Sequence, residues 1–498
     1  MKINYLDQVI HSLKTRGENF SFFIKEKSYT YDVLARNVSK IRTALRNTVA
    51  TTQLNSNSVV TVGIVTTDEL ETYASLFAVL LEGFTYVPIL ASQPLERSNE
   101  IISQADIKII LSSVMIEFDG AETINTRDLP FKNYVFDYDI PGYDSFSYIL
   151  FTSGSTGKPK GVPISHGNLQ AFVDAYSDFG YHVTENDRCL QPFELTFDVS
   201  VVSYLIPIIS GACVYTVPTD VIKYMFIAEI LEEHEITVAH LASSVIKYLR
   251  PYFDEIYLPK LKYCVLTAEA VPVDVTCEWS ERCPNAIIDD LYGPTEDTIY
   301  CTQYRFNKNS ENKSRNGILS IGKSLTSGKT IILDEYGNEC APNVQGELCL
   351  AGKQLTQGYW KNPEKNVESF FTYKCERFYK TGDICFADSD GDIMYCGRLD
   401  SQVKVQGFRI ELGEIEFHAK AFLEKANAVC IACENANGNT EIALFIEKDE
   451  CNEHDVKNFL KSKIPPYMIP SQIIYCSQFP LNVNGKTDKK ALKMMVKI

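Results

Sequence analysis

The chain has 498 residues, of which 45% are hydrophobic, and its formal net charge at pH 7 is −16. This length and composition predict more than one domain and a large buried core. The acidic balance argues against a general nucleic-acid binder, because neutralising a phosphate backbone requires a basic surface. It leaves open a nucleotide held by a few local donors and a metal ion.

The N-terminal segment and the cysteines indicate the cellular compartment. The first twenty residues contain no apolar stretch of the kind found in secretory leaders. The 15 cysteines are odd in number and follow no repeated spacing. We therefore expect a reduced, cytoplasmic setting in which most cysteines are small buried apolar groups.

Residues 1–145 alternate between helix-like and strand-like patterns, which is typical of a mixed α/β layer. Residues 29–45 have a helical pattern, and residues 58–66 read as a buried strand. We expect this region to contribute packing rather than chemistry.

The first stretch that points to chemistry is Tyr148–Val162. Residues 148–151 are apolar and rich in aromatic and branched side chains, which predicts a strand. The loop that follows, Thr152–Gly161, contains three glycines, four hydroxyl residues and two lysines. Glycines let several N–H groups face one point, and the hydroxyls and lysines add donors, so the loop suits a polyphosphate. Apolar residues at helical spacing predict a helix beginning near residues 165–168.

This loop differs from two familiar phosphate loops. A Walker loop requires a glycine where Thr152 stands and a hydroxyl residue where Pro159 stands, and the spacing G-x-G-x-x-G is absent. The remaining alternative is a flexible Gly/Ser linker. Linkers, however, seldom follow an apolar strand or contain Gly-Lys-Pro-Lys-Gly.

The segment TSGSTGKPKG resembles the phosphate loop of the adenylate-forming superfamily, which includes amino-acid adenylation enzymes of nonribosomal peptide synthesis, D-alanine–carrier protein ligases, acyl-CoA synthetases and luciferases. The resemblance extends from Tyr29 to Lys489. It implies an α/β fold with a large multi-sheet N-terminal domain, residues 1–399, and a small mobile α+β C-terminal domain, residues 400–498. It also implies ATP and Mg²⁺ as cofactors, with the phosphates held by Thr152, Ser153, Gly154, Ser155, Thr156, Gly157 and Lys160.

Asp198 stands in the largely apolar run of residues 190–205, which contains one other charged residue, Glu194. Burying a carboxylate is costly unless it is paired, so it is either a helix cap or surface position, or a counter-charge for a substrate cation. In the resemblance, FDVS matches the segment where amino-acid-activating members place an aspartate against the α-ammonium group. Aryl-acid and fatty-acid members lack this acid, so Asp198 favours an amino-acid substrate.

Residues 199–219 contain no charged side chain and are long enough to span a bilayer. They include Pro207, Gly211 and Pro218 and lack flanking basic clusters. We therefore predict a buried helix and strand here, and no membrane partner.

The resemblance implies further substrate-binding residues, which are Val199, Val202, His240, Val265, Thr267, Leu291, Ile299 and Tyr300. Their pattern most resembles pockets for serine, glycine or cysteine, and alanine and proline remain open. D-alanine ligases place a cysteine where Thr267 stands, which weakens that alternative. One methylene is worth only about 1–3 kcal/mol of discrimination, so no single amino acid is selected. His240 is equally compatible with a hydrogen-bonded core histidine.

The second strong motif is LYGPTE, residues 291–296, in which Gly-Pro enforces a turn. The resemblance implies that Tyr292 packs on adenine, Thr295 contacts phosphate, and Glu296 is catalytic and holds Mg²⁺, a hard cation that prefers oxygen ligands. Asp290 stands where the family commonly has asparagine near the adenine amino group, and a carboxylate can still accept that hydrogen bond. The alternative is a plain surface turn ahead of a strand.

Two motifs precede the domain boundary. YKTGD, residues 379–383, predicts the end of a strand, with Asp383 accepting hydrogen bonds from both ribose hydroxyls. The resemblance implies that Arg398 reaches the nucleotide. Asp400 matches the family's hinge, at a polar junction between two structured blocks.

The residues after the hinge predict a small α/β unit. Residues 414–426 and 453–463 read as helices, and residues 428–433, 441–447 and 471–477 as strands. Cys430 and Cys433 lie in an apolar strand without the further ligands of a zinc site, so we expect them in the core.

Asn484-Gly485 predicts a tight turn that would hold Lys486 out on a loop. Such a lysine is ordinarily just solvated. The resemblance implies instead that Lys486 is catalytic and contacts the substrate carboxylate during adenylation.

These motifs predict ATP-dependent activation of a small neutral amino acid as aminoacyl-AMP, followed by transfer to the phosphopantetheine thiol of a carrier protein. We expect the carrier to be a separate molecule, because the chain ends 12 residues after Lys486. Rotation about Asp400 would withdraw Lys486 and bring in the loop around residues 407–409. The alternatives are a D-alanine–carrier protein ligase, an acyl- or aryl-CoA ligase, and a catalytically silent carrier-binding relative. No nucleic-acid partner is expected.

Overall fold

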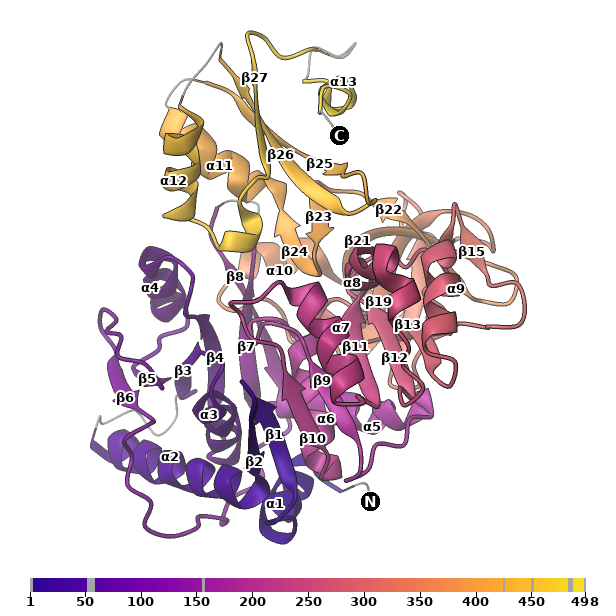
Figure 1. Cartoon of the computed structure of the whole chain (residues 1–498). Coiled ribbons are helices and arrows are strands. Elements are labelled where there is room, and N and C mark those ends of the chain that lie inside the picture. Colours follow the sequence, from indigo (N-terminus) through magenta and orange to yellow (C-terminus); the bar gives the residue numbers. More distant parts are fainter. Residues whose placement is uncertain are drawn as a thin grey trace.

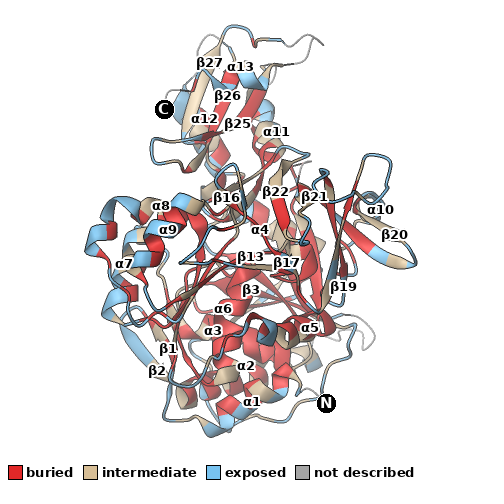
Figure 2. Cartoon of the chain, turned by 90° about the vertical axis from the view of Figure 1, so that its right-hand side faces the viewer, coloured by how far each residue is buried: buried red, intermediate tan, exposed pale blue. Residues whose placement is uncertain are grey.

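The computed structural model describes residues 3–51, 59–154, 157–423, 426–448, 452–481 and 487–496. Figure 1 shows a large lobe built from the first four-fifths of the chain, with a smaller lobe seated on it. Figure 2 shows that buried residues gather around the sheets of the large lobe and in the sheet of the small lobe. The expected mixed α/β class with a large N-terminal part and a smaller C-terminal part is confirmed.

The first sheet of the large lobe carries the predicted phosphate loop at its edge. Its six strands, in spatial order, are β6 (Glu122–Asn125), β5 (Ile109–Ser112), β3 (Thr61–Thr66), β4 (Thr85–Leu90), β7 (Phe146–Thr152) and β8 (Lys160–Ser165). All pair in parallel except β7 and β8, which form an antiparallel hairpin. Helices α2 (Tyr31–Thr51), α3 (Leu70–Leu81) and α4 (Leu95–Gln104) belong to this part of the chain. Every residue of β3 and β4 is buried, as expected of parallel strands covered on both faces.

The second sheet positions the predicted substrate residues. Its nine strands are β17 (Lys323–Ser324), β14 (Thr302–Arg305), β13 (Ile287–Tyr292), β12 (Tyr263–Thr267), β11 (Val238–Ala242), β9 (Arg188–Gln191), β10 (Cys213–Thr216), β1 (Phe20–Ile24) and β2 (Lys27–Thr30). The connecting helices are α1 (Tyr5–Thr15), α5 (His166–Tyr176), α6 (Val199–Ser210), α7 (Lys223–Glu233), α8 (Ser243–Leu249) and α9 (Val273–Arg282). β11, β12 and β13 are parallel and in register, so their carboxyl ends meet at one edge, where open α/β sheets bind ligands.

A third, antiparallel sheet completes the large lobe. It contains β18 (Gly328–Leu333), β19 (Gly346–Gly352), β21 (Glu376–Ala387), β20 (Phe370–Tyr373) and β22 (Ile393–Arg398), with α10 (Pro363–Ser369) beside β20. β21 and β22 pair so that Asp383 lies opposite Arg398. The small strands β15 (Ser314–Arg315) and β16 (Ile318–Leu319) form a separate pair.

The small lobe begins with the hairpin β23 (Gln402–Val405) and β24 (Phe408–Glu411). It continues with α11 (Leu412–Leu423), β25 (Ala428–Glu434), β26 (Thr440–Glu447), α12 (Glu453–Lys461), β27 (Gln472–Cys476) and α13 (Lys489–Lys493). Its own apolar core includes Ile410, Ile415, Leu444 and Leu460. The division of the chain at residue 400 stays a prediction.

Two local predictions were wrong. A strand, β8, lies between the phosphate loop and helix α5, so Gly161 is a strand residue rather than the end of the loop. YKTGD does not end a strand, because β21 continues through it to Ala387 with a register irregularity beside Asp383. Both errors arise from glycine, which we took as a strand breaker although neighbouring strands continue the pairing.

The other element predictions were confirmed to within a few residues. Residues 199–219 form helix α6 and strand β10, and no helix among the described residues is long and apolar enough to cross a membrane. Cys430 and Cys433 are both buried on β25. The helix after the phosphate loop begins at His166, with Ser165 and Asn168 forming a capping box.

Candidate active site

The turn of the β7–β8 hairpin is the predicted phosphate loop. Thr152 ends β7 opposite Lys160, which begins β8. A Cβ on Gly154 would lie 2.0 Å from the Lys158 carbonyl oxygen, and Gly157 has a φ of +81°, so both positions require glycine. Ser155 and Thr156, also predicted here, lie outside the described residues.

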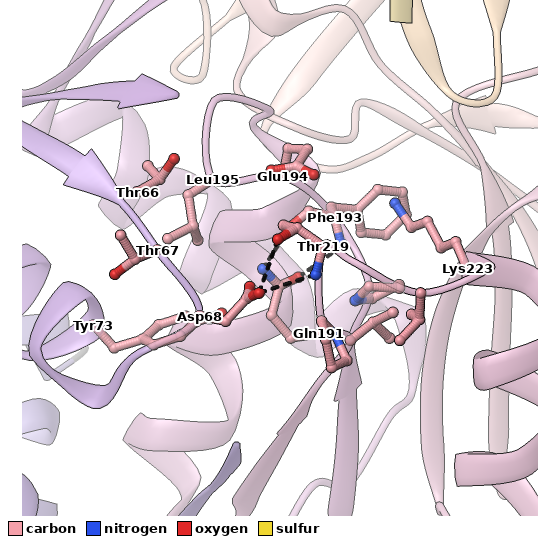
Figure 3. Close-up of a pocket in the computed structure, with 14 residues that line it drawn as sticks. Thr66, Thr67, Asp68, Tyr73, Gln191, Phe193, Glu194, Leu195, Thr219 and Lys223 are labelled. Atoms are coloured by element: carbon pink, nitrogen blue, oxygen red, sulfur yellow. Dashed lines mark hydrogen bonds between the residues drawn. The ribbon is translucent and has the colours of Figure 1, made fainter. Parts of the chain in front are cut away.

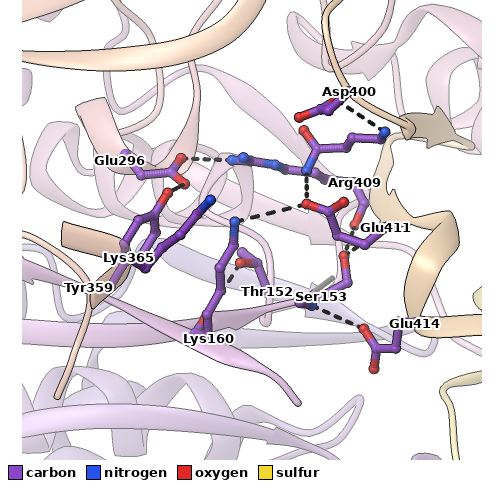
Figure 4. Close-up of polar contacts among 12 residues, drawn as sticks. Thr152, Ser153, Lys160, Glu296, Tyr359, Lys365, Asp400, Arg409, Glu411 and Glu414 are labelled. Atoms are coloured by element: carbon purple, nitrogen blue, oxygen red, sulfur yellow. Dashed lines mark hydrogen bonds and ion pairs between the residues drawn. The ribbon is translucent and has the colours of Figure 1, made fainter. Parts of the chain in front are cut away.

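The described part of this loop makes hydrogen bonds to the small lobe (Figure 4). The Ser153 hydroxyl donates to the Arg409 carbonyl oxygen at 2.9 Å and accepts from the Glu411 N–H at 3.0 Å. The Gly154 N–H donates to Glu414 Oε2 at 3.1 Å. The two groups predicted to donate hydrogen bonds to a nucleotide phosphate, the Ser153 hydroxyl and the Gly154 N–H, therefore donate to residues of β24 and α11 in this structure.

Glu296 is fully buried in the short helical turn Thr295–Asp297, directly after β13. Its Oε1 accepts from the Tyr359 hydroxyl at 2.7 Å, and its Oε2 accepts from Arg409 Nη1 at 2.7 Å. Burial alone would raise the pKa of Glu296, but the Arg409 and Lys160 cations outweigh burial and hold it at about 2. Glu296 is therefore an ionised, hard oxygen anion in a buried site.

Lys160 lies beside this carboxylate. Its ammonium is 4.0 Å from Glu411 Oε1 and 5.0 Å from the centre of the Tyr359 ring. Burial, together with the neighbouring Arg409 cation, lowers the pKa of Lys160 to about 8. The phosphate side of the site thus has more than one cation within reach of Glu296.

The residues predicted to hold the nucleoside are grouped around Asp383. The Tyr292 hydroxyl donates to its Oδ2 at 2.6 Å, and Arg398 Nη1 donates to its Oδ1 at 2.7 Å. Arg398 also bonds both carboxylate oxygens of Asp400 at 2.7 Å, so the predicted hinge residue is tied to the predicted nucleotide residues. Tyr292, Asp383 and Arg398, which come from separate motifs, are therefore in direct contact.

A cavity of about 760 Å³ adjoins these residues and lies between the two lobes. Its lining includes Asp290, Tyr292, Arg398 and Asp400 from the predicted set, together with Lys404 of the small lobe. The Lys404 ammonium lies 5.7 Å from the centre of the Tyr292 ring. Burial raises the pKa of Asp290 well above its usual value, although Lys404 opposes this shift.

On the substrate side, Asp198 immediately precedes helix α6 and is 5% exposed. It occupies the N-cap position of α6, but among the described residues no capping hydrogen bond to its side chain is found. Its burial shows that the surface-position alternative is wrong. Its Oδ2 is buried and has no hydrogen-bond partner among the residues that the structure describes. Burial raises the pKa of Asp198 to about 6, even though a hydrogen bond from Thr295 lowers it. A buried carboxylate oxygen without a protein donor is costly, because its desolvation is uncompensated, so a donor from a ligand would be favourable here.

Four of the other predicted substrate-binding residues lie on the parallel strands β11, β12 and β13. His240 lies beside Val265, and Thr267 beside Leu291, whose carbonyl oxygen accepts from the Thr267 hydroxyl at 2.7 Å. His240 Nδ1 and the Tyr300 hydroxyl are 3.0 Å apart, and their rings are stacked within 4° of parallel. Burial lowers the pKa of His240 to about 3, so it is neutral. The remaining predicted wall residues, all buried, are Val199, Val202 and Ile299.

A second, smaller pocket of the large lobe lies between the ends of β3, β9 and β10 (Figure 3). Its lining includes Asp68, whose Oδ2 accepts from both the N–H and the hydroxyl of Thr219 at 2.9 Å. Glu194 and Lys223 also line it, and burial raises the pKa of Glu194 and lowers that of Lys223. None of the predicted site residues lies in this lining, so this pocket is separate from the candidate active site.

Sequence reasoning did not identify several residues that contact the predicted ones or that join the two lobes. Tyr359 lies in a segment that we interpreted as structural, yet it bonds Glu296. Arg97 on α4 forms a buried ion pair with Glu414 on α11. The Glu269 carboxylate accepts from the Gly407 N–H at 2.8 Å. No local pattern marks these pairs, since the partners of Glu296, Glu414 and Gly407 are 63 to 317 residues distant in sequence.

One predicted catalytic residue, Lys486, lies outside the described residues. Helix α13 begins at Lys489 and packs on β25 in the small lobe. Both views place α13 in the upper part of that lobe (Figures 1 and 2).

Glu296 has the charge and the surroundings of a Mg²⁺ ligand. It is ionised, buried and close to the phosphate-loop donors, which suits a hard cation bound to phosphate oxygens. Among the described residues no group of three or more His, Cys, Asp and Glu side chains could hold a metal. Mg²⁺ at Glu296 would therefore take its other ligands from the nucleotide and water, as it usually does, and the residues fit that arrangement.

Comparison with known proteins shows the family and the fold of the chain. The family model for AMP-binding enzymes matches residues 11–360. A linear gramicidin synthase of Brevibacillus parabrevis is 32% identical over 506 residues, covering 98% of this chain and 10% of that protein, so the chain spans about a tenth of it. The D-alanine–D-alanyl carrier protein ligase of Streptococcus pneumoniae is 31% identical, covering 85% of this chain and 86% of that protein. The fold also matches the crystal structure of the Vibrio cholerae adenylation domain AlmE in complex with glycyl-adenosine-5′-phosphate, with a TM-score of 0.86, 24% identity, and coverage of 99% of this chain and 98% of the other.

Proposed function

Because the chain belongs to the family of AMP-binding enzymes, we propose that it activates a small neutral amino acid with ATP and transfers it to the phosphopantetheine thiol of a separate carrier protein. It is an adenylate-forming enzyme of the nonribosomal adenylation or D-alanine–carrier ligase type. The proposed transfer to a carrier protein is supported by the similarity to the D-alanine–D-alanyl carrier protein ligase, which the chain matches over most of that ligase's length.

The observation that carries an amino-acid substrate is Asp198. Its buried Oδ2 has no hydrogen-bond partner in the described part of the chain. Burial and the Asp198 charge raise the pKa of Tyr148, so the carboxylate lies close to other buried groups. A substrate α-ammonium group would supply the missing donor and the missing charge. A fatty or aryl acid has no cation and would leave the carboxylate uncompensated.

A small side chain is supported by the residues around Asp198. Tyr300 is held against His240 by a hydrogen bond and by stacking, and the Thr267 hydroxyl is bonded to the Leu291 carbonyl oxygen. These side chains are buried and fixed, so they would exclude long side chains. Glycine, alanine, serine, cysteine and proline remain the candidates.

In the adenylation step, a carboxylate attacks the α-phosphoryl group, which brings two anions together. The task of the protein is therefore alignment and charge neutralisation. Asp198 would orient the amino acid, Tyr292, Asp383 and Arg398 would hold the nucleoside, and Lys160 with the phosphate loop would hold the leaving pyrophosphate. Mg²⁺ held by Glu296 would neutralise phosphate charge when bound. Lys486 would contact the substrate carboxylate.

The test is ATP–pyrophosphate exchange with each of the twenty amino acids, D-alanine, and matched acids that lack the amino group, such as acetate and propionate. We expect exchange with one or a few small amino acids and none with the acids. Exchange that is equally fast with acids would identify an acyl-CoA ligase instead. Absence of AMP formation with every substrate would indicate a silent relative.

Asp198→Asn provides the matched variant for this test. It should abolish amino-acid-dependent exchange while leaving ATP binding by calorimetry unchanged. Asp254→Asn, at a side chain that is fully exposed, is the control and should behave as the wild type. A wild-type rate in Asp198→Asn would contradict the proposed contact with the α-ammonium group.

A further inference from the structure

A further cavity, of about 1000 Å³, lies between helices α4 and α10 and adjoins the phosphate loop. Its lining includes Gly154, Lys158 and Lys160 of the loop and Glu411 of β24. Most of the remaining lining belongs to α4 and to residues 360–368, which lie outside the predicted site motifs. The described residues of this lining include none that line the cavity beside Tyr292. The phosphate side of the site therefore has a space of its own, separate from the nucleoside side.

Lys365, on α10, lines this cavity and extends toward the phosphate-loop lysine. Figure 4 shows the side chains of Lys365 and Lys160 reaching into the same region of the site, beside Tyr359. The Lys365 cation is close enough to Lys160 to help lower its pKa, after burial and the Arg409 cation. Ammonium groups this close repel each other, and an anion of high charge bound between them would relieve the repulsion.

The present partner of Lys365 is readily exchanged. The Lys365 ammonium is 2.6 Å from Glu368 Oε2, one turn along the same short helix. The Lys365 side chain is 39% exposed and that of Glu368 is 69% exposed, and ion pairs exposed to this degree contribute little stability. An anion that bound Lys365 would therefore lose little by breaking this pair.

The charges at the inner end of the cavity also favour an anion. Three cations, Lys160, Lys365 and Arg409, lie there with two acids, Glu296 and Glu411. The other acids of the lining are on α4 and α10, where they are partly or fully exposed and are screened by water and salt. The inner end therefore has an excess of positive charge next to the phosphate loop.

We propose that the cavity between α4 and α10 is a pyrophosphate site and the route by which pyrophosphate leaves, with Lys365 and Lys158 as its binding residues. The proposal rests on the proposed function, in which pyrophosphate is the first product. Lys365 exchanges Glu368 for the departing anion, while the nucleoside and the activated amino acid stay on the other side of the phosphate loop.

The first experiment measures the binding of Mg²⁺–pyrophosphate to the whole protein by calorimetry, with folding checked by circular dichroism. Lys365→Met removes a charged hydrogen bond to the anion, so we expect about tenfold weaker binding, and Lys365→Arg should keep most of the affinity. Lys329→Met, which removes an exposed ion pair with Glu376, is the control and should bind as the wild type does. Equal affinities of Lys365→Met and the wild type would overturn the proposal.

Glu368→Gln distinguishes anion binding from a structural role of the ion pair. It frees Lys365 without removing a cation, so we expect pyrophosphate to bind about two- to threefold tighter. The matched control, Glu376→Gln, should leave the affinity unchanged. If the pair only stabilised α10, both Lys365→Met and Glu368→Gln would weaken binding, and that result would overturn the proposal.

The route is tested by narrowing the cavity. Ser103 on α4 is exposed and lines the cavity, so Ser103→Trp would place an indole in the path. We expect pyrophosphate release, followed by a coupled assay during one turnover, to be severalfold slower, with the KM for the amino acid unchanged. Ser310→Trp, at another exposed serine, is the control. Release at the wild-type rate in Ser103→Trp would overturn the route.

Failure of this proposal can be distinguished from failure of the proposed function. A wild type that exchanges pyrophosphate with an amino acid, but whose affinity for pyrophosphate does not depend on Lys365, would contradict only the site. A wild type that binds Mg²⁺–pyrophosphate through Lys365 but activates no amino acid would contradict only the proposed function.

Discussion

The amino-acid side and the phosphate side of the site are built differently. On the amino-acid side all the described groups come from the large lobe, and one carboxylate oxygen of Asp198 is buried without a partner. On the phosphate side the corresponding acid, Glu296, has both oxygens hydrogen-bonded, one of them to the small lobe. The pKa of Asp198 is raised to about 6, whereas the pKa of Glu296 is held at about 2.

This difference shows how a two-lobed enzyme can divide its work. The buried Asp198 carboxylate of the large lobe is destabilised by desolvation, and a substrate cation beside it would compensate for this. Glu296, in contrast, is already hydrogen-bonded by Tyr359 and Arg409. A ligand could replace Arg409 only if the small lobe moved. The predictions below test whether the two sides respond separately.

The largest effect is expected from Asp198→Asn on the amino-acid side. Removing a buried charged contact made with the substrate should lower amino-acid-dependent exchange by about 100- to 1000-fold. The KM for ATP should change little, because the proposed nucleoside residues Tyr292, Asp383 and Arg398 are held by one another. Equal losses for both substrates would show that the two sides are not separable.

Acid pH should reproduce this loss gradually. Asp198 must be ionised to pair with an α-ammonium group, and burial raises its pKa to about 6. The value of kcat/KM for the amino acid should therefore fall about tenfold per pH unit below pH 6. It should be level from pH 6 until the deprotonation of Lys160, whose pKa is about 8. The Asp198→Asn variant should lack this slope. A wild-type profile that is level down to about pH 4.5 would contradict the assignment.

Tyr359→Phe is the matching change on the phosphate side. It removes the hydrogen bond to Glu296 Oε1, and a hydrogen bond to a charged group is worth about 1.5–3 kcal/mol, so the KM for Mg²⁺–ATP should rise about tenfold or more. The KM for the amino acid should stay the same. Tyr257→Phe, at a side chain that is 63% exposed, is the control. A larger effect on the amino-acid KM would contradict the separation.

The smallest effect concerns stability. The raised pKa of Asp198 means that the folded protein binds this proton more tightly than the unfolded chain, so the stabilisation is present below about pH 4 and is lost as the pH rises through 6. At about pH 7.5 the buried charge should cost about 3 kcal/mol, and Asp198→Asn should raise the thermal midpoint by a few degrees. At about pH 4.5 the two proteins should unfold at similar temperatures. A variant that is less stable at the higher pH would show that the carboxylate has an unrecognised partner.

The sequence alone predicted the candidate site residues and determined most of the elements that hold them. The glycines of residues 152–161, the Gly-Pro turn before Glu296 and the acid at position 198 were recognisable because local backbone geometry and the cost of burying a charge are properties of short segments. The helices and strands of the small lobe were also predicted, since their apolar periodicity is local.

Tertiary structure decided what these residues are bonded to. The strand β8 was missed because its pairing with β7 overrides the tendency of glycine to end strands. The bonds from Tyr359 and Arg409 to Glu296, and from Arg97 and Gly154 to Glu414, join residues that are far apart in the chain, so no local pattern contains them. Residue type fixes which charges a site has, but the packing of one lobe on the other fixes which of those charges are already neutralised.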